Sequence, residues 1–180
     1  MRIIKDDTVA VIIDIQERLF PHMFNKSQLE MNVEILLNGL EILDIPILLT
    51  EQYSKGLGST IPSIQRSLAE TRPIEKLTFS CCGENRFITE LNKINKKHVI
   101  LAGIEAHVCV LQTVLDLVEF GFQPVLVEDC VSSRRENDKL IALDRIRNSG
   151  AIITTYESIL LELCQVAGTE KFKMISKLIK

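Results

Sequence analysis

The stretch HVILAGIEAHVCVLQT, residues 98–113, decides the fold of this chain. Its first five residues form an apolar, β-branched run of the kind found in buried strands. A turn that contains Gly103 follows, and from residue 108 the apolar positions recur with helical spacing. A buried strand that leads through a tight turn into a helix is typical of a parallel sheet with helices on its faces.

The same alternation runs along the rest of the chain. The expected strands are residues 8–14, 46–50, 72–76, 98–102, 124–128 and 151–154. The expected helices are residues 27–43, 84–94, 108–120, 132–148, 158–166 and 170–179. Continuous apolar strands between amphipathic helices predict an α/β fold with three αβα layers and a doubly wound, six-stranded parallel sheet of Rossmann-like type.

Length, charge and cysteine content restrict the class of protein. The 180 residues contain no repeat, low-complexity tract or flexible linker, which predicts one domain over residues 1–180. A net charge of −3 gives no basis for binding nucleic acid or an anionic membrane. The chain shows neither a secretory leader nor an apolar run near the ~18 residues of a membrane span. Its five cysteines lack disulfide or zinc spacing, so we expect a cytoplasmic protein with reduced thiols.

Three chemically distinct side chains stand at three expected strand ends. In doubly wound folds, ligands bind beyond the carboxyl ends of the strands, where the strand order reverses. Asp14, Lys76 and Cys109 occupy such positions. Taken singly, they would be a turn residue, a solvated lysine and a small core residue. Together they favour a site for cysteine hydrolysis.

Each of the three has an expected role in that chemistry. Cys109 is the candidate nucleophile, because the start of a helix favours thiolate over thiol. Asp14 would take the thiol proton and return it to the leaving group. Lys76 would hold Asp14 by ion pairing and lower the pKa of the thiol. Backbone N–H groups near Glu105 and Cys109 could stabilise the oxyanion.

Longer motifs around these residues carry a family resemblance. They are AVIIDIQ (residues 10–16), EKLTFS (75–80) and LAGIEAHVCVLQTVLDL (101–117). The chain resembles the isochorismatase-like cysteine hydrolases, a superfamily that contains nicotinamidases, N-carbamoylsarcosine amidases and isochorismatases. Two further segments, LLTEQYSKGLGSTIPSI (48–64) and DCVSSR (129–134), are similar to the isochorismatase domain-containing protein 2 branch.

The resemblance implies a fold, a triad and a reaction. The fold is that of isochorismatase-like hydrolases, and the triad is Asp14, Lys76 and Cys109. A cis peptide between Ile104 and Glu105 would turn the N–H groups of Glu105 and Cys109 onto the oxyanion. The implied reaction is hydrolysis of an amide-like C–N bond in a small molecule through an acyl-enzyme. Family members form dimers and tetramers, so a homo-oligomer is expected.

One motif departs from the nicotinamidase pattern. Nicotinamidases hold a divalent metal with an Asp-x-His pair after the second strand, where this chain has Glu51-Gln52-Tyr53. The only histidines are His22, His98 and His107, and one carboxylate with an amide is a poor metal site. We therefore expect neither a metal nor another cofactor, which weakens the case for nicotinamide as the substrate.

Five residues are candidates for the substrate pocket. Gln16 lies two residues beyond the expected base and is expected to orient it. Phe20, Tyr53 and Phe79 follow strand ends and would form an aromatic pocket, with core packing as the alternative. His107 precedes Cys109 by two residues and is a candidate pocket wall. Cys81 or Cys82 could also approach the site, although a buried structural role is the simpler expectation.

Two other functions fit the same residues. One is a non-catalytic binding or scaffold protein on the same fold. The other is a redox-sensitive protein in which a low-pKa Cys109 is oxidised. Isochorismatases cleave a vinyl ether without relying on the cysteine, so the resemblance leaves the bond type and the substrate open.

Overall fold

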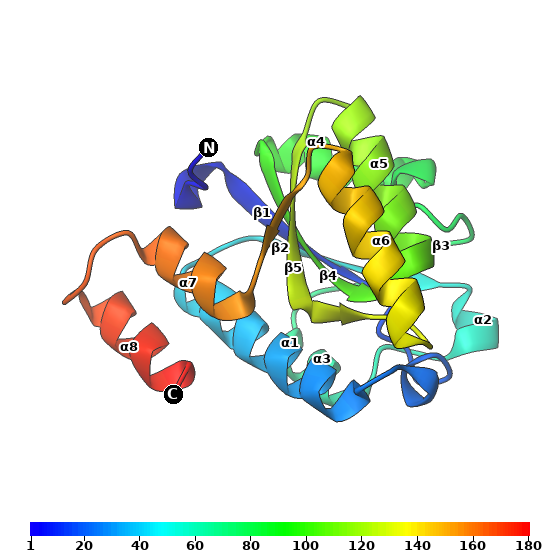
Figure 1. Ribbon diagram of the computed structural model, residues 1–180, viewed down its shortest axis with the longest axis horizontal. Helices are drawn as coiled ribbons and strands as arrows, with labels where there is room; N and C mark the ends of the chain where they lie inside the picture. Colours follow the sequence, from blue (N-terminus) through cyan, green and yellow to red (C-terminus); the bar gives the residue numbers. More distant parts are fainter.

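A single parallel sheet runs through the centre of the computed structural model, which describes residues 1–180 (Figure 1). The strand order is β3-β2-β1-β4-β5-β6, and every neighbouring pair is parallel. The strands are β1 (Thr8–Ile13), β2 (Ile47–Gln52), β3 (Ile74–Lys76), β4 (His98–Ile104), β5 (Gln123–Ser132) and β6 (Ile152–Thr154). The predicted six-stranded, doubly wound α/β fold is confirmed.

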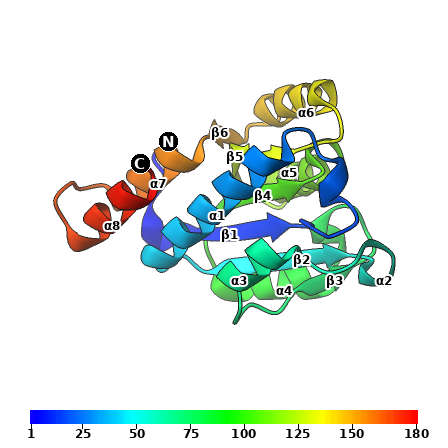
Figure 2. The same cartoon turned by 90° about the horizontal axis from the view of Figure 1, so that it is seen from below.

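Helices cover both faces of the sheet (Figures 1 and 2). One face packs against α1 (Lys26–Ile42), α3 (Pro62–Ser67) and α7 (Tyr156–Cys164), and α8 (Glu170–Leu178) packs on α1 and α7. The other packs against α4 (Asn85–Ile94), α5 (Leu111–Glu119) and α6 (Glu136–Asn148). The short α2 (Ser54–Leu57) lies at the end toward which β1 and β2 point. None of the helices combines the length and apolarity that a membrane crossing needs.

The central strand β1 shows why the strands are continuous apolar runs. Ala10 and Ile12 belong to the core on the α1 side, whereas Val9, Val11 and Ile13 belong to the core on the α5 side. All six residues of β1 are buried. Because helices cover both faces of the sheet, the residues on each face of β1 are apolar. The alternation of apolar and polar residues seen in a strand with one solvent-exposed face is therefore absent.

Several predicted boundaries were wrong. β5 continues to Ser132, so α6 begins at Glu136 and not at residue 132. The pairing of β4 with β5 shifts register between Leu101 and Gly103, and this irregularity carries β5 past its predicted end. Residues 53–71 were expected to form a loop, but they contain α2 and α3, the latter with Pro62 in its first turn.

Gly103 permits a close approach of the two central strands. Its φ is +139°, a conformation that side chains other than glycine rarely adopt. It pairs with Ile13, and a Cβ atom at this position would lie 2.1 Å from the Ile13 carbonyl oxygen. That carbonyl belongs to a buried strand and has no room to shift, so the backbone of β4 depends on a glycine here.

We expect Gly103→Ala to destabilise the fold by more than about 3 kcal/mol, because a backbone clash adds to the unfavourable φ. Urea denaturation measures this loss. Gly150→Ala is the matched control, since Gly150 also has a positive φ of 94° but open space around its Cα. The control should lose only about 1–2 kcal/mol. Equal losses in the two variants would show that the approach to Ile13 is unimportant.

Candidate active site

Asp14, Lys76 and Cys109 converge at the carboxyl ends of the strands. Asp14 follows β1, Lys76 is the last residue of β3, and Cys109 lies five residues beyond β4. The strand order reverses between β1 and β4, so Asp14 and Cys109 flank the switch point. The fold therefore brings together the three side chains that the sequence singled out.

A fully buried ion pair joins Lys76 to Asp14. Lys76 Nζ lies 2.6 Å from Asp14 Oδ2, and neither side chain is exposed to solvent. The other carboxylate oxygen, Oδ1, accepts a hydrogen bond of 2.7 Å from Thr50 Oγ1. Asp14 has a left-handed backbone with φ of 53°, at the point where the chain leaves β1. Both oxygens of the carboxylate are thus held by protein donors.

The Lys76 ammonium lies among oxygen atoms only. Besides Asp14, it donates to the carbonyls of Phe79 at 2.9 Å and Thr78 at 3.2 Å, and to Gln52 Oε1 at 3.3 Å. Burial lowers the pKa of Lys76, but the negative charge of Asp14, with smaller effects from the neighbouring Cys81 and Cys109, outweighs it and raises the pKa above its ordinary value of 10.5. Lys76 is therefore a permanent cation at neutral pH.

Cys109 is a neutral thiol, contrary to the expectation of a thiolate. Its residue is 4% exposed, and Sγ donates to Gln52 Oε1 at 3.0 Å. Burial raises the pKa of the thiol, the charge of Asp14 raises it further, and Lys76 opposes both. The prediction from the helix start was wrong because removal from water outweighs a partial charge at a helix terminus.

The turn that carries Cys109 has an unusual backbone. The peptide between Ile104 and Glu105 is cis, and residues Ala106–Val110 form a π-helical turn before α5. The Glu105 carbonyl accepts hydrogen bonds from the N–H groups of Val108 and Val110, at 3.0 and 3.3 Å. The N–H of Glu105 itself donates to no protein acceptor. This turn therefore offers a free backbone donor four residues before the thiol.

Two side chains outside the turn fix its position. The Glu105 carboxylate forms an ion pair with Arg134, Nε to Oε1 at 2.9 Å. Thr113 Oγ1 donates to the Cys109 carbonyl at 2.7 Å and accepts the N–H of Cys81 at 3.0 Å. The turn that carries Cys109 is thereby connected to the segment that follows Lys76.

Gln52 was missed as a residue of the site. It was not among the predicted site residues, yet its side-chain oxygen contacts both Cys109 and Lys76. The available signal was a polar residue at the end of the second expected strand, beside the strand of Asp14. Gln16 was expected to orient Asp14, but its side chain bonds instead to the backbone of Gln52 and to the Gly58 carbonyl.

Cys81 is also close to the triad. Its buried Sγ donates to Thr50 Oγ1 at 3.8 Å, the same hydroxyl that donates to Asp14. Burial raises the pKa of Cys81 to about 11, with a further increase from Asp14. Cys81 is thus a neutral, buried thiol that packs behind the site, which agrees with a structural role.

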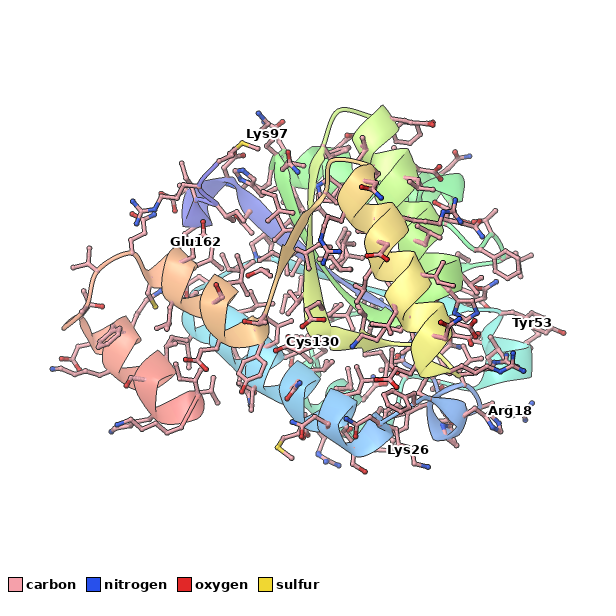
Figure 3. The ribbon with its side chains drawn as sticks, in the orientation of Figure 1. Arg18, Lys26, Tyr53, Lys97, Cys130 and Glu162 are labelled. Atoms are coloured by element: carbon pink, nitrogen blue, oxygen red, sulfur yellow. The ribbon has the colours of Figure 1, made fainter.

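The remaining pocket candidates lie at different depths. Tyr53 is 52% exposed and points outward at the edge of the molecule (Figure 3), and Phe79 is 53% exposed although its carbonyl binds Lys76. Phe20 packs against the core on the α1 side, so core packing is the better description of it. His107 is partly buried, with Nδ1 2.9 Å from Ser133 Oγ.

Glu51-Gln52-Tyr53, which occupies the position of the nicotinamidase metal motif, makes other contacts. Glu51 Oε1 accepts hydrogen bonds from the N–H and the hydroxyl of Thr60, both at 2.7 Å. Gln52 is directed at Cys109, and Tyr53 points away from the molecule. No three His, Cys, Asp or Glu side chains gather in a geometry that could hold a metal ion.

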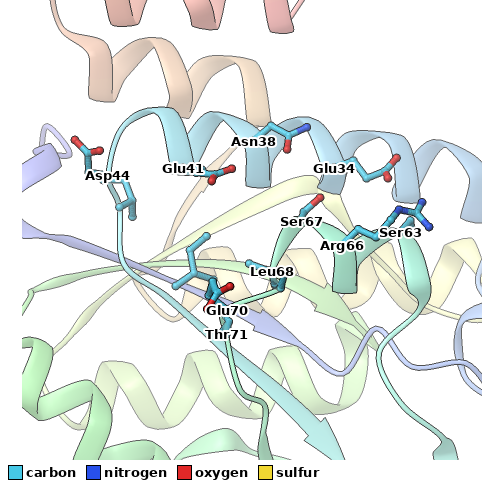
Figure 4. A pocket seen from close by; sticks show the side chains of 13 residues that line it. Glu34, Asn38, Glu41, Asp44, Ser63, Arg66, Ser67, Leu68, Glu70 and Thr71 are labelled. Carbon is cyan, nitrogen blue, oxygen red and sulfur yellow. The ribbon is translucent and has the colours of Figure 1, made fainter.

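The largest cavity lies away from this chemistry. It measures about 530 Å³ and is located between α1 and α3 (Figure 4), with Glu34, Glu41, Arg66 and Glu70 among its polar lining residues. A second cavity of about 380 Å³ is lined by Tyr53, Lys76 and Leu77. The Lys76 side chain is closed to solvent, so this cavity does not open onto the ammonium or the thiol.

Comparison with known proteins identifies the family. A family model for the isochorismatase domain matches residues 8–158. The chain belongs to the isochorismatase domain family. Isochorismatase domain-containing protein 2 from Danio rerio is 40% identical over 172 residues, which cover 96% of this chain and 86% of that protein. The predicted membership in this hydrolase superfamily, and the similarity to this branch, are confirmed.

Solved structures of isochorismatase-fold proteins superpose closely. The MAR1 ribonuclease of Caenorhabditis elegans is 39% identical, has a TM-score of 0.93, and the alignment covers 99% of this chain and 92% of that one. The ycaC gene product of Escherichia coli, described as an octameric hydrolase of unknown specificity, has a TM-score of 0.93 at 22% identity over 99% and 90% of the two chains. The second similarity concerns the fold alone.

We expect Asp14→Asn to destabilise the protein by about 3–5 kcal/mol at pH 7, because it leaves the Lys76 charge buried without a partner. In the wild type, the raised pKa of Lys76 means that its contribution is present below pH 10.5 and is lost above it. In the variant, burial alone lowers the pKa of Lys76, so stability should instead rise as the pH approaches 10.5. Urea denaturation at pH 7 and pH 10 separates the two proteins, because over this interval the wild type should keep the contribution of Lys76 while the variant gains stability.

The double variant Asp14→Asn/Lys76→Met is the control for that experiment. It removes both charges and should regain most of the stability lost at pH 7. If Asp14→Asn alone were as stable as the wild type at pH 7, the ion pair would have no structural role.

Proposed function

We propose that this protein is a metal-independent cysteine hydrolase that cleaves an amide-like C–N bond of a small molecule. The observation that carries the proposal is the convergence of a thiol, a carboxylate and a buried ammonium on one strand-end site, next to an unpaired backbone N–H at Glu105. These are the groups that acyl transfer to a cysteine requires.

In the first half of the reaction, Cys109 Sγ attacks the carbonyl carbon of the substrate. Because the thiol is neutral, its proton passes to Asp14 as the S–C bond forms. The electrons of the carbonyl π bond move to oxygen, and the Glu105 N–H is the donor for that oxyanion. Lys76 keeps Asp14 in place and stays charged throughout, since three further oxygens hold it.

In the second half, the C–N bond breaks. Asp14 returns its proton to the departing nitrogen, which leaves as an amine or ammonia, and the acyl group remains on Cys109 as a thioester. A water molecule then attacks the thioester, with Asp14 again as the base. Asp14 passes the proton taken from that water to the departing sulfur, so that the thiol is regenerated and the acid product leaves.

RNA cleavage is the second candidate, because a relative of 39% identity is named a ribonuclease. The site gives it less support. A polynucleotide would have to reach a thiol that is 4% exposed, on a chain with a net charge of −3. A redox-sensor function is also less favoured, since sensor thiols have low pKa values and burial raises that of Cys109.

A homo-oligomer and a cytoplasmic location belong to the same proposal. Tyr53, Leu77 and Phe79 leave more than half of their surface exposed beside the site, which favours contact with a second copy. Light scattering on the purified protein would then give a mass of at least two chains, and a monomer would contradict this part.

We expect Cys109→Ala to lower the hydrolysis of whichever substrate the wild type accepts by at least about 10³-fold. The assay is a screen of small amides and ureides, with a labelled RNA oligonucleotide included as a further substrate. Intact-mass spectrometry of quenched reactions should detect an acyl adduct on the wild type and none on the variant.

Cys82→Ala is the matched control, because Cys82 is a partly buried cysteine and Asp14 is not among the groups that shift its pKa. It should retain wild-type turnover. Persistent amide hydrolysis by Cys109→Ala would refute the covalent mechanism, and cleavage of RNA alone would favour the second candidate.

A further inference from the structure

The Cys109 thiol donates its hydrogen bond to an amide oxygen, Gln52 Oε1, at 3.0 Å. This oxygen can only accept hydrogen bonds, so it stabilises the S–H form and faces a thiolate unfavourably. The triad mechanism assigns no task to Gln52, although its side chain contacts both the nucleophile and Lys76.

The orientation of the Gln52 amide is determined by its surroundings. Nε2 donates to the Leu77 carbonyl at 3.2 Å, while Oε1 accepts from Lys76 at 3.3 Å. A flipped amide would place its oxygen against that carbonyl and its NH₂ group against the ammonium. Both contacts would be repulsive, so the oxygen is the atom that faces the thiol.

The backbone beneath this amide is held by Gln16. Gln16 Oε1 accepts the Gln52 N–H at 2.8 Å, and its Nε2 donates to the Gln52 carbonyl at 3.0 Å and the Gly58 carbonyl at 2.7 Å. Gln16 is fully buried, so these bonds do not compete with water. The Gln52 side chain therefore starts from a fixed point.

We propose that Gln52 is a positioning residue that holds Cys109 as a thiol at rest, with its proton directed away from Asp14. The proposal rests on the cysteine-hydrolase function above. During attack, the S–H bond turns from Gln52 to Asp14, the proton moves to the carboxylate, and the sulfur electrons form the S–C bond. At rest, the free enzyme has little thiolate to lose to electrophiles or oxidants.

Other charged groups also influence this thiol. Asp14 at the end of β1, Lys76 on β3 and the second thiol of Cys81 act on it from neighbouring elements, and Glu105 and His107 belong to its own turn. Lys76 opposes the protonated state, whereas Asp14 favours it. The Asp14 side chain is a second hydrogen-bond partner of the thiol, and the S–H bond to Gln52 Oε1 at 3.0 Å is the one that the geometry defines.

The test is the pH dependence of Cys109 alkylation by iodoacetamide, followed residue by residue with mass spectrometry. Gln52→Met keeps the length of the side chain and removes the amide oxygen. The pH at which the alkylation rate of Cys109 is half-maximal, the midpoint, should therefore fall by at least one pH unit. One unit gives about tenfold more thiolate at pH 7 and about threefold faster alkylation, because a less basic thiolate is a weaker nucleophile. An unchanged or higher midpoint would overturn the proposal.

Two further variants separate the amide oxygen from packing. Gln65→Met makes the same substitution on the exposed surface of α3 and should leave the midpoint unchanged. Gln52→Glu restores an acceptor oxygen next to the thiol, and its midpoint should be at or above that of the wild type. If Gln52→Glu and Gln52→Met lowered the midpoint equally, loosened packing would explain both and the proposal would fail.

The outcomes remain distinguishable from those of the proposed function. Alkylation does not require turnover, so the midpoints can be measured even without a known substrate. An acyl adduct on Cys109, together with alkylation midpoints that are the same in the wild type and the Gln52 variants, would refute only the role of Gln52. Shifted midpoints combined with full hydrolysis by Cys109→Ala would refute the covalent function.

Discussion

The buried ion pair between Lys76 and Asp14 is the interaction on which the rest of the site depends. It connects the edge strand β3 with the end of the central strand β1, across β2. Removing two charges from water costs several kcal/mol for each ion, which only close geometry and additional hydrogen bonds offset. Thr50 and Gln52 supply some of those bonds from β2, the strand between the two partners. The sheet order therefore explains why polar residues end β2.

This arrangement produces a site rich in hydrogen-bond acceptors. The carboxylate of Asp14 and the amide oxygen of Gln52 both act on Cys109, and the single nearby cation is shared among four oxygens. Such surroundings favour a thiol over a thiolate that is always present. In the proposed hydrolysis, the group that accepts the thiol proton is then as important as the sulfur that attacks.

The sequence predicted the fold and the convergence of Asp14, Lys76 and Cys109 because both depend on strong local patterns. Runs such as residues 8–14 and 98–102 are apolar on both faces, and the strand ends place Asp14, Lys76 and Cys109 at one edge. The protonation of Cys109, the role of Gln52 and the bonds of Gln16 were not predictable, because burial and side-chain direction arise only from tertiary packing. The end of β5 was misplaced for a similar reason, since its last residues pair through an irregular register with Gly103 and Ile104.

The lysine of the site stands on a strand of only three residues at the edge of the sheet, and three residue pairs join that strand to β2. Edge elements with few backbone bonds open more readily than the interior of a domain. A brief detachment of β3 would withdraw the cation together with Ile74, its one residue in the α5-side core, while the core on the α1 side stays closed. The integrity of the Asp14–Lys76 pair is therefore coupled to local unfolding of a three-residue edge strand, and loss of the pair can precede global denaturation.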